Sequence, residues 1–160
     1  MEGRDIPRLI VACGVSLSAG VVGSLAMTRE GFRPWYTSID KPVFTPPDWV
    51  FAPVWTVLYI LMGVAAFLVW RQGLTLRAVR AALGWFLVQL VLNAAWTPVF
   101  FGLHRIGAAL AIVVLLAAAV LMTMYRFFLV SRAAGWLLVP YLAWVSYATV
   151  LNASIWWMNR

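Results

Sequence analysis

Hydrophobic residues along this chain gather into long runs instead of alternating with polar ones. Five runs lack any charged side chain, and they cover residues 9–27, 49–70, 81–103, 106–125 and 133–159. Each run is close to or above the roughly 20 residues that a helix needs to cross about 30 Å of hydrocarbon. Membrane strands would need only about 10 residues of alternating character, and no such pattern occurs. We therefore predict an all-α membrane protein, a five-transmembrane-helix bundle with helices at 6–27, 49–70, 80–103, 106–126 and 133–157.

The polar connections between these runs are short, with one exception. His104 and Arg105 form a tight turn, and residues 126–132 form another short loop. The exception is the loop 28–48, whose four prolines fix backbone angles and predict that no regular helix forms there. A long, stiff, aromatic loop of this kind predicts a lid over one end of a single domain spanning residues 1–160.

Composition and charge agree with a membrane location. The chain has 160 residues, of which 64% are hydrophobic and 11% are charged, whereas soluble domains carry about 25% charged residues. The net charge of +7 would favour a nucleic-acid partner in a soluble protein. Here the cationic side chains stand at the ends of the apolar runs, where they set topology and attract anionic headgroups. We predict a lipid bilayer as the partner and no nucleic acid.

The cationic residues also predict an orientation. Five crossings place the termini on opposite sides of the membrane. The amino-terminal side carries Arg4, Arg8, Arg71, Arg77, Arg80, Arg126 and Arg132, and the other side carries Arg29, Arg33, Lys41, Arg105 and Arg160. The excess of cationic residues on the amino-terminal side, seven against five, favours a cytoplasmic amino terminus. A cleaved signal peptide is the alternative for the first run, but Glu2, Asp5 and the length of the run disfavour it.

Few residues are suited to conventional catalysis. A single cysteine, Cys13, and a single histidine, His104, cannot form an internal disulfide or a metal site of several ligands. All five acidic residues lie outside the apolar runs, so no buried carboxylate is available for ion coupling. We predict no metal and no cofactor.

Ten tryptophans are the most unusual feature of the composition. Those near the ends of runs fit the aromatic belts at the two membrane interfaces, and they are Trp70, Trp136, Trp156 and Trp157. Trp55, Trp96 and Trp144 lie inside their runs beside polar residues. These three either line a pocket or pack the bundle.

Polar residues also lie inside two of the runs. Gln89 and Asn93 are four residues apart and share one helix face with Trp96, and Ser146, Thr149 and Asn152 recur at three-residue spacing. Such groups are costly in lipid, so we expect them to turn inward. There they bond neighbouring helices, contact a ligand, or do both.

Prolines and small residues shape the helices themselves. Pro53, Pro98 and Pro140 stand within helices or at their starts, where each either opens irregular space for a cavity or merely bends the helix. Ser16, Gly20 and Ser24 form a seam of small residues on the first helix. This seam serves packing inside the bundle or, alternatively, a dimer contact.

Ordered motifs over most of the chain resemble one known family. They are Trp35-Tyr36, Lys41-Pro42, Pro46-Pro47-x-Trp49-Val50, Pro53-Val54-Trp55, Leu58-Tyr59, Met62-Gly63, Gln89-Leu90-x-Leu92-Asn93-x-x-Trp96-x-Pro98-x-Phe100-Phe101, Pro140-Tyr141-Leu142-x-Trp144, Ala148-Thr149-x-Leu151-Asn152 and Trp156. In these positions the chain resembles the tryptophan-rich sensory protein / translocator protein (TspO/MBR) family. The resemblance implies a five-helix bundle, often a homodimer, with a pocket that the first loop closes.

The resemblance also implies ligands and site residues. Ligands of the family include protoporphyrin IX, other tetrapyrroles, cholesterol and synthetic benzodiazepine-like compounds. The function so implied is a membrane receptor or sensor for porphyrins and other hydrophobic small molecules. The ligand-binding residues implied here are Trp35, Tyr36, Phe51, Trp55, Asn93, Trp96, Phe100, Trp144, Ala148 and Leu151.

Two alternative functions follow from the same resemblance. Light-dependent porphyrin breakdown has been proposed for some bacterial relatives, and it would make Trp55 and Trp144 catalytic. A tetrapyrrole or sterol transporter is the other alternative, and the absence of buried charges argues against a coupled one. The short amino terminus favours a bacterial cell-envelope membrane.

The chain departs from the family pattern in two places. Vertebrate members carry a cholesterol-recognition segment whose tyrosine and basic positions are Ala153 and Trp157 here, which puts sterol handling in doubt. Gly84 is followed four residues later by Val88, where some relatives repeat glycine, so the sequence leaves a dimer contact of the Gly-xxx-Gly type open.

Overall fold

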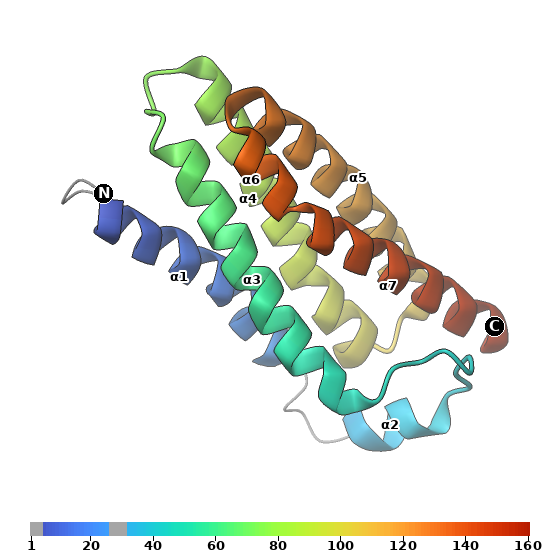
Figure 1. The fold of residues 1–160 in the computed structure, drawn as a ribbon. Coiled ribbons are helices and arrows are strands. Elements are labelled where there is room, and N and C mark those ends of the chain that lie inside the picture. Colours follow the sequence, from blue (N-terminus) through green and yellow to red (C-terminus); the bar gives the residue numbers. More distant parts are fainter. Residues whose placement is uncertain (1–4, 26–31) are drawn as a thin grey trace.

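The chain folds into a bundle of long helices, with one short helix across its end (Figure 1). The computed structural model describes residues 5–25 and 32–160. Its helices are α1 (Asp5–Ser24), α2 (Phe32–Ser38), α3 (Asp48–Trp70), α4 (Arg77–Thr97), the π-helix η2 (Pro98–Gly102), α5 (Ile106–Val130), α6 (Arg132–Leu137) and α7 (Val139–Met158). No strand occurs within the described ranges, so the predicted all-α class is confirmed.

Five of these helical stretches are long and apolar enough to cross a membrane. They are α1, α3, α4 continued by η2, α5, and α6 continued by α7. An odd number of crossings places the termini at opposite ends of the bundle, as Figure 1 shows. Of the cationic residues that predict the orientation, Arg4 and Arg29 lie outside the described residues.

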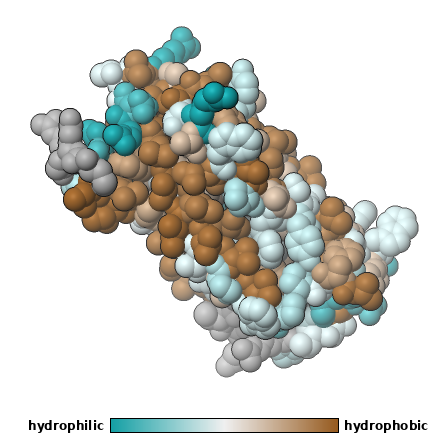
Figure 2. Space-filling model, viewed as in Figure 1, coloured by the Kyte–Doolittle hydropathy of each residue, from teal (hydrophilic) through white to brown (hydrophobic). Residues whose placement is uncertain are grey.

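The outer face of the bundle is apolar where lipid would touch it. Figure 2 shows hydrophobic residues over the middle of the molecule and hydrophilic ones mainly towards its ends. Large apolar side chains such as Ile10, Val21, Val91 and Leu115 are more than half exposed on their helices. In water such a surface would be unstable, whereas in hydrocarbon it is the favourable one. The protein is therefore an integral, multi-pass membrane protein.

The loop 28–48 is more regular than the sequence predicts. The prediction that its prolines exclude a helix is wrong for residues 32–38, which form α2. Pro34 stands in the first turn of α2, where a missing backbone N–H removes no helical hydrogen bond. The three later prolines lie beyond the end of α2, and residues 39–47 form no helix.

The connection predicted at 126–132 is also mostly helical. Helix α5 continues to Val130, and Ser131 alone separates it from α6. The helix continues past Arg126 because Phe127 is fully buried and its ring stacks on Phe86 of α4, 5.8 Å away. The Ser131 hydroxyl then accepts a 3.4 Å hydrogen bond from the Ala134 N–H and so caps α6.

Two prolines coincide with interruptions of a predicted helix. Pro140 is at the start of α7, so the span predicted at 133–157 as one helix is divided at Leu138. Pro98 opens η2, where the 80–103 helix changes from α to π geometry. A proline cannot donate to the preceding turn, which explains a break at each place. Pro53, by contrast, lies within a continuous α3.

The seam of small residues on α1 is used inside the chain. A Cβ atom built on Gly20 would clash with the Tyr59 ring, and one on Gly23 would meet the Thr97 hydroxyl at 3.2 Å. On the facing side, a Cβ on Gly63 of α3 would lie 2.5 Å from the Cys13 Cα. Small residues thus let α1 pack closely on α3 and α4.

Candidate functional site

A cavity of about 680 Å³ opens inside the bundle near the end that α2 covers. Its wall includes residues of every membrane-spanning helix and of α2. They are Gly20, Ser24, Tyr36, Thr37, Asp48, Phe51, Ala52, Trp55, Tyr59, Asn93, Trp96, Thr97, Phe100, Phe101, Val113, Leu116, Trp144, Val145, Ala148, Leu151, Asn152 and Ile155. On α3 the lining residues recur three or four positions apart, so one helix face supplies them all.

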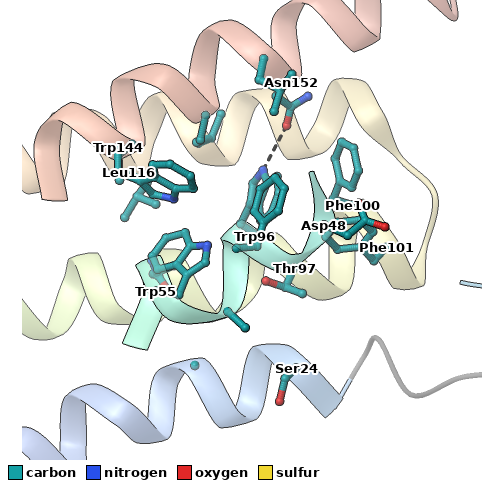
Figure 3. A pocket seen from close by; sticks show the side chains of 18 of the residues that line it. Ser24, Asp48, Trp55, Trp96, Thr97, Phe100, Phe101, Leu116, Trp144 and Asn152 are labelled. Carbon is teal, nitrogen blue, oxygen red and sulfur yellow. Dashed lines mark hydrogen bonds between the residues drawn. The ribbon is translucent and has the colours of Figure 1, made fainter. Parts of the chain in front are cut away.

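Two indoles from different helices project into the same space. Figure 3 shows Trp55 on α3 and Trp144 on α7 pointing into the cavity from opposite sides. The Trp55 ring stacks on Tyr59, with centroids 5.4 Å apart. The Trp144 ring meets Phe51 edge-on at 5.9 Å and lies 5.6 Å from Tyr147. Aromatic neighbours therefore hold both indoles in place, which favours a preformed wall over a flexible one.

A third indole is held by a hydrogen bond. The Trp96 N–H donates to Asn152 Oδ1 over 3.0 Å, as the dashed line in Figure 3 marks. The Asn152 amide in turn donates to the Ile106 carbonyl over 3.1 Å. The Trp96 ring also stacks on Phe100, with centroids 5.1 Å apart. These contacts join α4, α5 and α7 beside the cavity.

The buried amides of α4 bond other helices. The Tyr59 hydroxyl donates to Asn93 Oδ1 over 2.6 Å, and Asn93 Nδ2 donates to the Tyr141 oxygen over 3.1 Å. The Tyr141 hydroxyl then donates to Gln89 Oε1 over 2.7 Å. This chain links α3, α4 and α7. Both polar ends of Asn93 are thereby engaged, so this amide serves the bundle even though it lines the cavity.

The polar row on α7 does not turn inward along its whole length. Ser146 is exposed, and its hydroxyl donates to the Leu142 carbonyl of its own helix over 2.8 Å. The prediction that Ser146 faces the interior is therefore wrong, because a serine can satisfy its hydroxyl within one turn. Thr149 is half-buried and bonds the Val145 carbonyl in the same way. Only Asn152 is buried and bonds other helices.

The segment between α2 and α3 is tied across the end of the bundle. The Asp40 N–H donates to Asn159 Oδ1 over 3.0 Å, and Asn159 Nδ2 donates back to the Asp40 carbonyl over 2.9 Å. The Tyr147 hydroxyl donates to the Phe44 carbonyl over 2.7 Å. Side chains of α7 and of Asn159, the residue after its end, thus hold the main chain of this segment beside the cavity.

These features match a known group of membrane proteins. A sequence model of the TspO/MBR family matches residues 11–158. The chain belongs to the TspO/MBR family. It is 41% identical over 159 residues to the translocator protein of Homo sapiens, covering 96% of this chain and 93% of the human one. It is 40% identical over 156 residues to the tryptophan-rich protein TspO of Chlorobaculum tepidum, covering 98% of both chains. It is also 40% identical over 153 residues to protein CrtK of Rhodobacter capsulatus, covering 93% of this chain and 89% of that one.

Most of the residues that the family resemblance implies lie at one place in this TspO/MBR chain. The lining includes Tyr36, Phe51, Trp55, Asn93, Trp96, Phe100, Trp144, Ala148 and Leu151. Trp35 is not part of the lining. Its ring stacks on His104, 4.3 Å away, and meets Phe100 edge-on at 5.6 Å. Helix α2 presents the next two residues, Tyr36 and Thr37, to the cavity.

Sequence reasoning missed several lining residues. Tyr59 could have been found from its spacing, because it lies one helical turn beyond Trp55 on the same face. Val113 and Leu116 of α5 carry no such signal, since they sit in an unbroken apolar run. Asp48 stands outside the apolar runs and so gives no signal in the sequence, yet it lines the cavity from the first turn of α3.

The chemistry available in this TspO/MBR cavity is that of aromatic contact and hydrogen bonding. Burial, and after it the negative charge of Asp48, raise the pKa of the Tyr36 hydroxyl, so this group is a neutral donor at physiological pH. Within the described parts of the chain, no three His, Cys, Asp or Glu side chains gather to hold a metal ion. A flat apolar ligand fits this lining better than a highly charged one.

Proposed function

We propose that this TspO/MBR protein is a membrane receptor that binds porphyrins and related flat hydrophobic ligands in the cavity between α3 and α7. The observation that carries the proposal is the placement of Trp55, Trp96 and Trp144 around one cavity. Offset stacking of a macrocycle on an indole supplies both buried apolar area and a favourable quadrupole contact. The volume of about 680 Å³ is within the range of about 300–1,000 Å³ typical of small-molecule sites.

In this proposal the segment 28–48 acts as a lid. Its described part supplies Tyr36 and Thr37 to the cavity lining, and its contacts with Asn159 and Tyr147 tie it to α7. A lid of this kind separates a bound ligand from water and slows its release. Residues 28–31 of the segment lie outside the described part of the chain.

The direct test is a titration of the detergent-purified protein with protoporphyrin IX in the dark. Saturable quenching of tryptophan fluorescence, with a matching change in the porphyrin spectrum, is expected. Trp144→Ala should weaken binding by about tenfold or more, because it removes one aromatic wall. Wild-type affinity in the Trp144→Ala protein would contradict the proposal.

A matched control is available at the other end of the bundle. Trp136 is 65% exposed and does not line the cavity. Trp136→Ala removes the same kind of side chain, so it reports any general effect of losing an indole. Its affinity for protoporphyrin IX should equal that of the wild type.

The opposed placement of Trp55 and Trp144 supports a second candidate function, light-dependent porphyrin degradation. Dioxygen would be the oxidant of the illuminated macrocycle, and the two indoles would be electron donors beside it. Illumination in air should then bleach bound porphyrin faster than free porphyrin. Trp55→Phe and Trp144→Phe should slow this loss without abolishing binding. Equal bleaching rates in wild type and both variants would remove this candidate.

The proposal places the protein in a bacterial cell-envelope membrane with its amino terminus in the cytoplasm. At the amino-terminal end the cationic residues of the described chain are Arg8, Arg71, Arg77, Arg80, Arg126 and Arg132, against Arg33, Lys41, Arg105 and Arg160 at the other end. This imbalance supports the orientation by the positive-inside rule. Reporter fusions at each terminus of the protein in cells test it.

A homodimer completes the proposal, as the family resemblance implies. On α4 no heavy atom lies within 4 Å of a Cβ built on Gly84, so another helix has room to approach there. Light scattering of the detergent-solubilised protein measures the association state, and a monomer in all mild detergents would contradict the dimer.

A further inference from the structure

The cavity wall carries one charged side chain among the described residues, and that side chain is the carboxylate of Asp48. Asp48 is the first residue of α3 and is exposed at the mouth, whereas Trp55 lies deeper on the same helix. Seven residues at 1.5 Å each separate them by about 10 Å along the helix axis. Figure 3 shows Asp48 at the opposite end of the lining from Trp55 and Trp144. A ligand stacked on the indoles therefore extends towards a negative charge.

No described cation neutralises this charge within the lining. The nearest cation in the chain sequence, Lys41, is already engaged: its ammonium donates to the Tyr36 and Ile39 carbonyls and lies 4.8 Å from the centre of the Tyr36 ring. The structure shows one salt bridge among described residues, between Asp5 and Arg71 at the other end of the bundle. Among the described residues, the Asp48 carboxylate at the cavity mouth therefore has no cationic partner.

The field of this carboxylate reaches the lining. The negative charge of Asp48 adds to burial in raising the pKa of the Tyr36 hydroxyl. A group that disfavours a negative charge on Tyr36 also disfavours one on a bound ligand at that place. The buried amides do not offset this effect on a ligand's negative charge. In both Asn93 and Asn152 the side-chain oxygen and the side-chain N–H already form hydrogen bonds within the protein.

We propose that Asp48 determines which charge form of a ligand the cavity accepts. Uncharged or cationic flat aromatic molecules bind in preference to those whose carboxylates lie at the mouth. Among tetrapyrroles this favours forms with esterified side chains over free dicarboxylic acids. The inference rests on the proposed porphyrin function and adds the ligand class to it.

A cycle of two ligands and two proteins tests the inference. Protoporphyrin IX carries two carboxylates, and its dimethyl ester has the same macrocycle without them. Asp48→Asn keeps the shape of the side chain and remains suitable for a helix start. We expect Asp48→Asn to increase affinity for the acid, relative to the ester, by about three- to tenfold. A change of this size is expected from removing one repulsion between like charges at a partly solvated mouth. This gain should shrink at high salt.

Asp40→Asn is the matched control. It changes the net charge equally at the same end of the molecule, but Asp40 does not line the cavity, and its bonds to Asn159 use only its main chain. We expect the acid-to-ester ratio of Asp40→Asn to equal that of the wild type, and thermal unfolding to confirm that both variants are folded. The same ratio in wild type and Asp48→Asn would overturn the inference and leave porphyrin binding standing. No binding of either ligand to either protein would overturn both.

Discussion

The phenol of Tyr59 on α3 donates a 2.6 Å hydrogen bond to the side-chain oxygen of Asn93 on α4. The bond lies between two buried residues beside the cavity, and the Asn93 amide N–H donates a second hydrogen bond to the Tyr141 oxygen of α7. In hydrocarbon neither group could find water, so each depends on the other. The two hydrogen bonds of Asn93 therefore hold part of the cavity wall and join three helices.

Replacing the amide at the centre of this network should destabilise the bundle. Asn93→Leu keeps the size of the side chain but leaves the Tyr59 hydroxyl without its acceptor, at a cost of about 1–3 kcal/mol. A lower thermal unfolding midpoint in detergent should report this loss. Ser146→Ala is the control, because that exposed hydroxyl bonds only its own helix. Equal midpoints for Asn93→Leu and wild type would show that the network contributes nothing to stability.

The contact between α1 and α3 should not tolerate an extra methyl group. A Cβ on Gly63 would lie 2.5 Å from the Cys13 Cα, which is backbone and cannot rotate away. Gly63→Ala should therefore push the helices apart and cost about 1–3 kcal/mol, measured by thermal unfolding.

Gly14→Ala provides the comparison for this contact. Nothing lies within 4 Å of a Cβ on Gly14, which is also on α1. Its substitution should be neutral or stabilising by up to about 1 kcal/mol, since alanine favours a helix over glycine. If both alanines had the same effect, the close packing of α1 on α3 would be disproved.

Filling the cavity should weaken binding strongly without unfolding the protein. Ala148 lies in the lining on α7, between Trp144 and Leu151 along the helix. In Ala148→Trp the new indole occupies the ligand space, and we expect affinity for protoporphyrin IX to fall at least about tenfold. Ala143→Trp places the same ring on the exposed side of α7 and should bind as the wild type does. Unchanged affinity in Ala148→Trp would place the ligand elsewhere.

Loosening the lid should act on the rate of release. Asn159→Ala removes both hydrogen bonds to the Asp40 main chain. Because a hydrogen bond contributes a net of about 0.5–1.5 kcal/mol, we expect porphyrin dissociation to accelerate about two- to tenfold. Stopped-flow displacement measures the rate. Ser154→Ala, whose hydroxyl bonds only the Val150 carbonyl of its own helix, should leave the rate unchanged. Dissociation from Asn159→Ala at the wild-type rate would mean that this tie does not retain the ligand.

The sequence by itself determined the class of fold and the family. Runs of about 20 uncharged residues can only be helices in a bilayer, because each backbone polar group must find its partner within the segment. The same constraint forces amides such as Gln89 and Asn93 inward, so their burial could be predicted from spacing alone. Trp55, Trp96 and Trp144 could be named as interior residues for a similar reason, since they lie at lipid depth beside polar groups.

Only the tertiary structure decided how those inward groups are used. Whether Asn93 bonds a neighbouring helix or faces an empty space depends on residues 34 and 48 positions away in the chain, which no local pattern encodes. The cavity wall from α5, the pairing of Trp35 with His104 and the position of Asp48 at the mouth depend equally on how the helices are set against one another. Helix packing is a property of side-chain shapes meeting across the bundle, whereas periodicity along one helix specifies only which face turns inward.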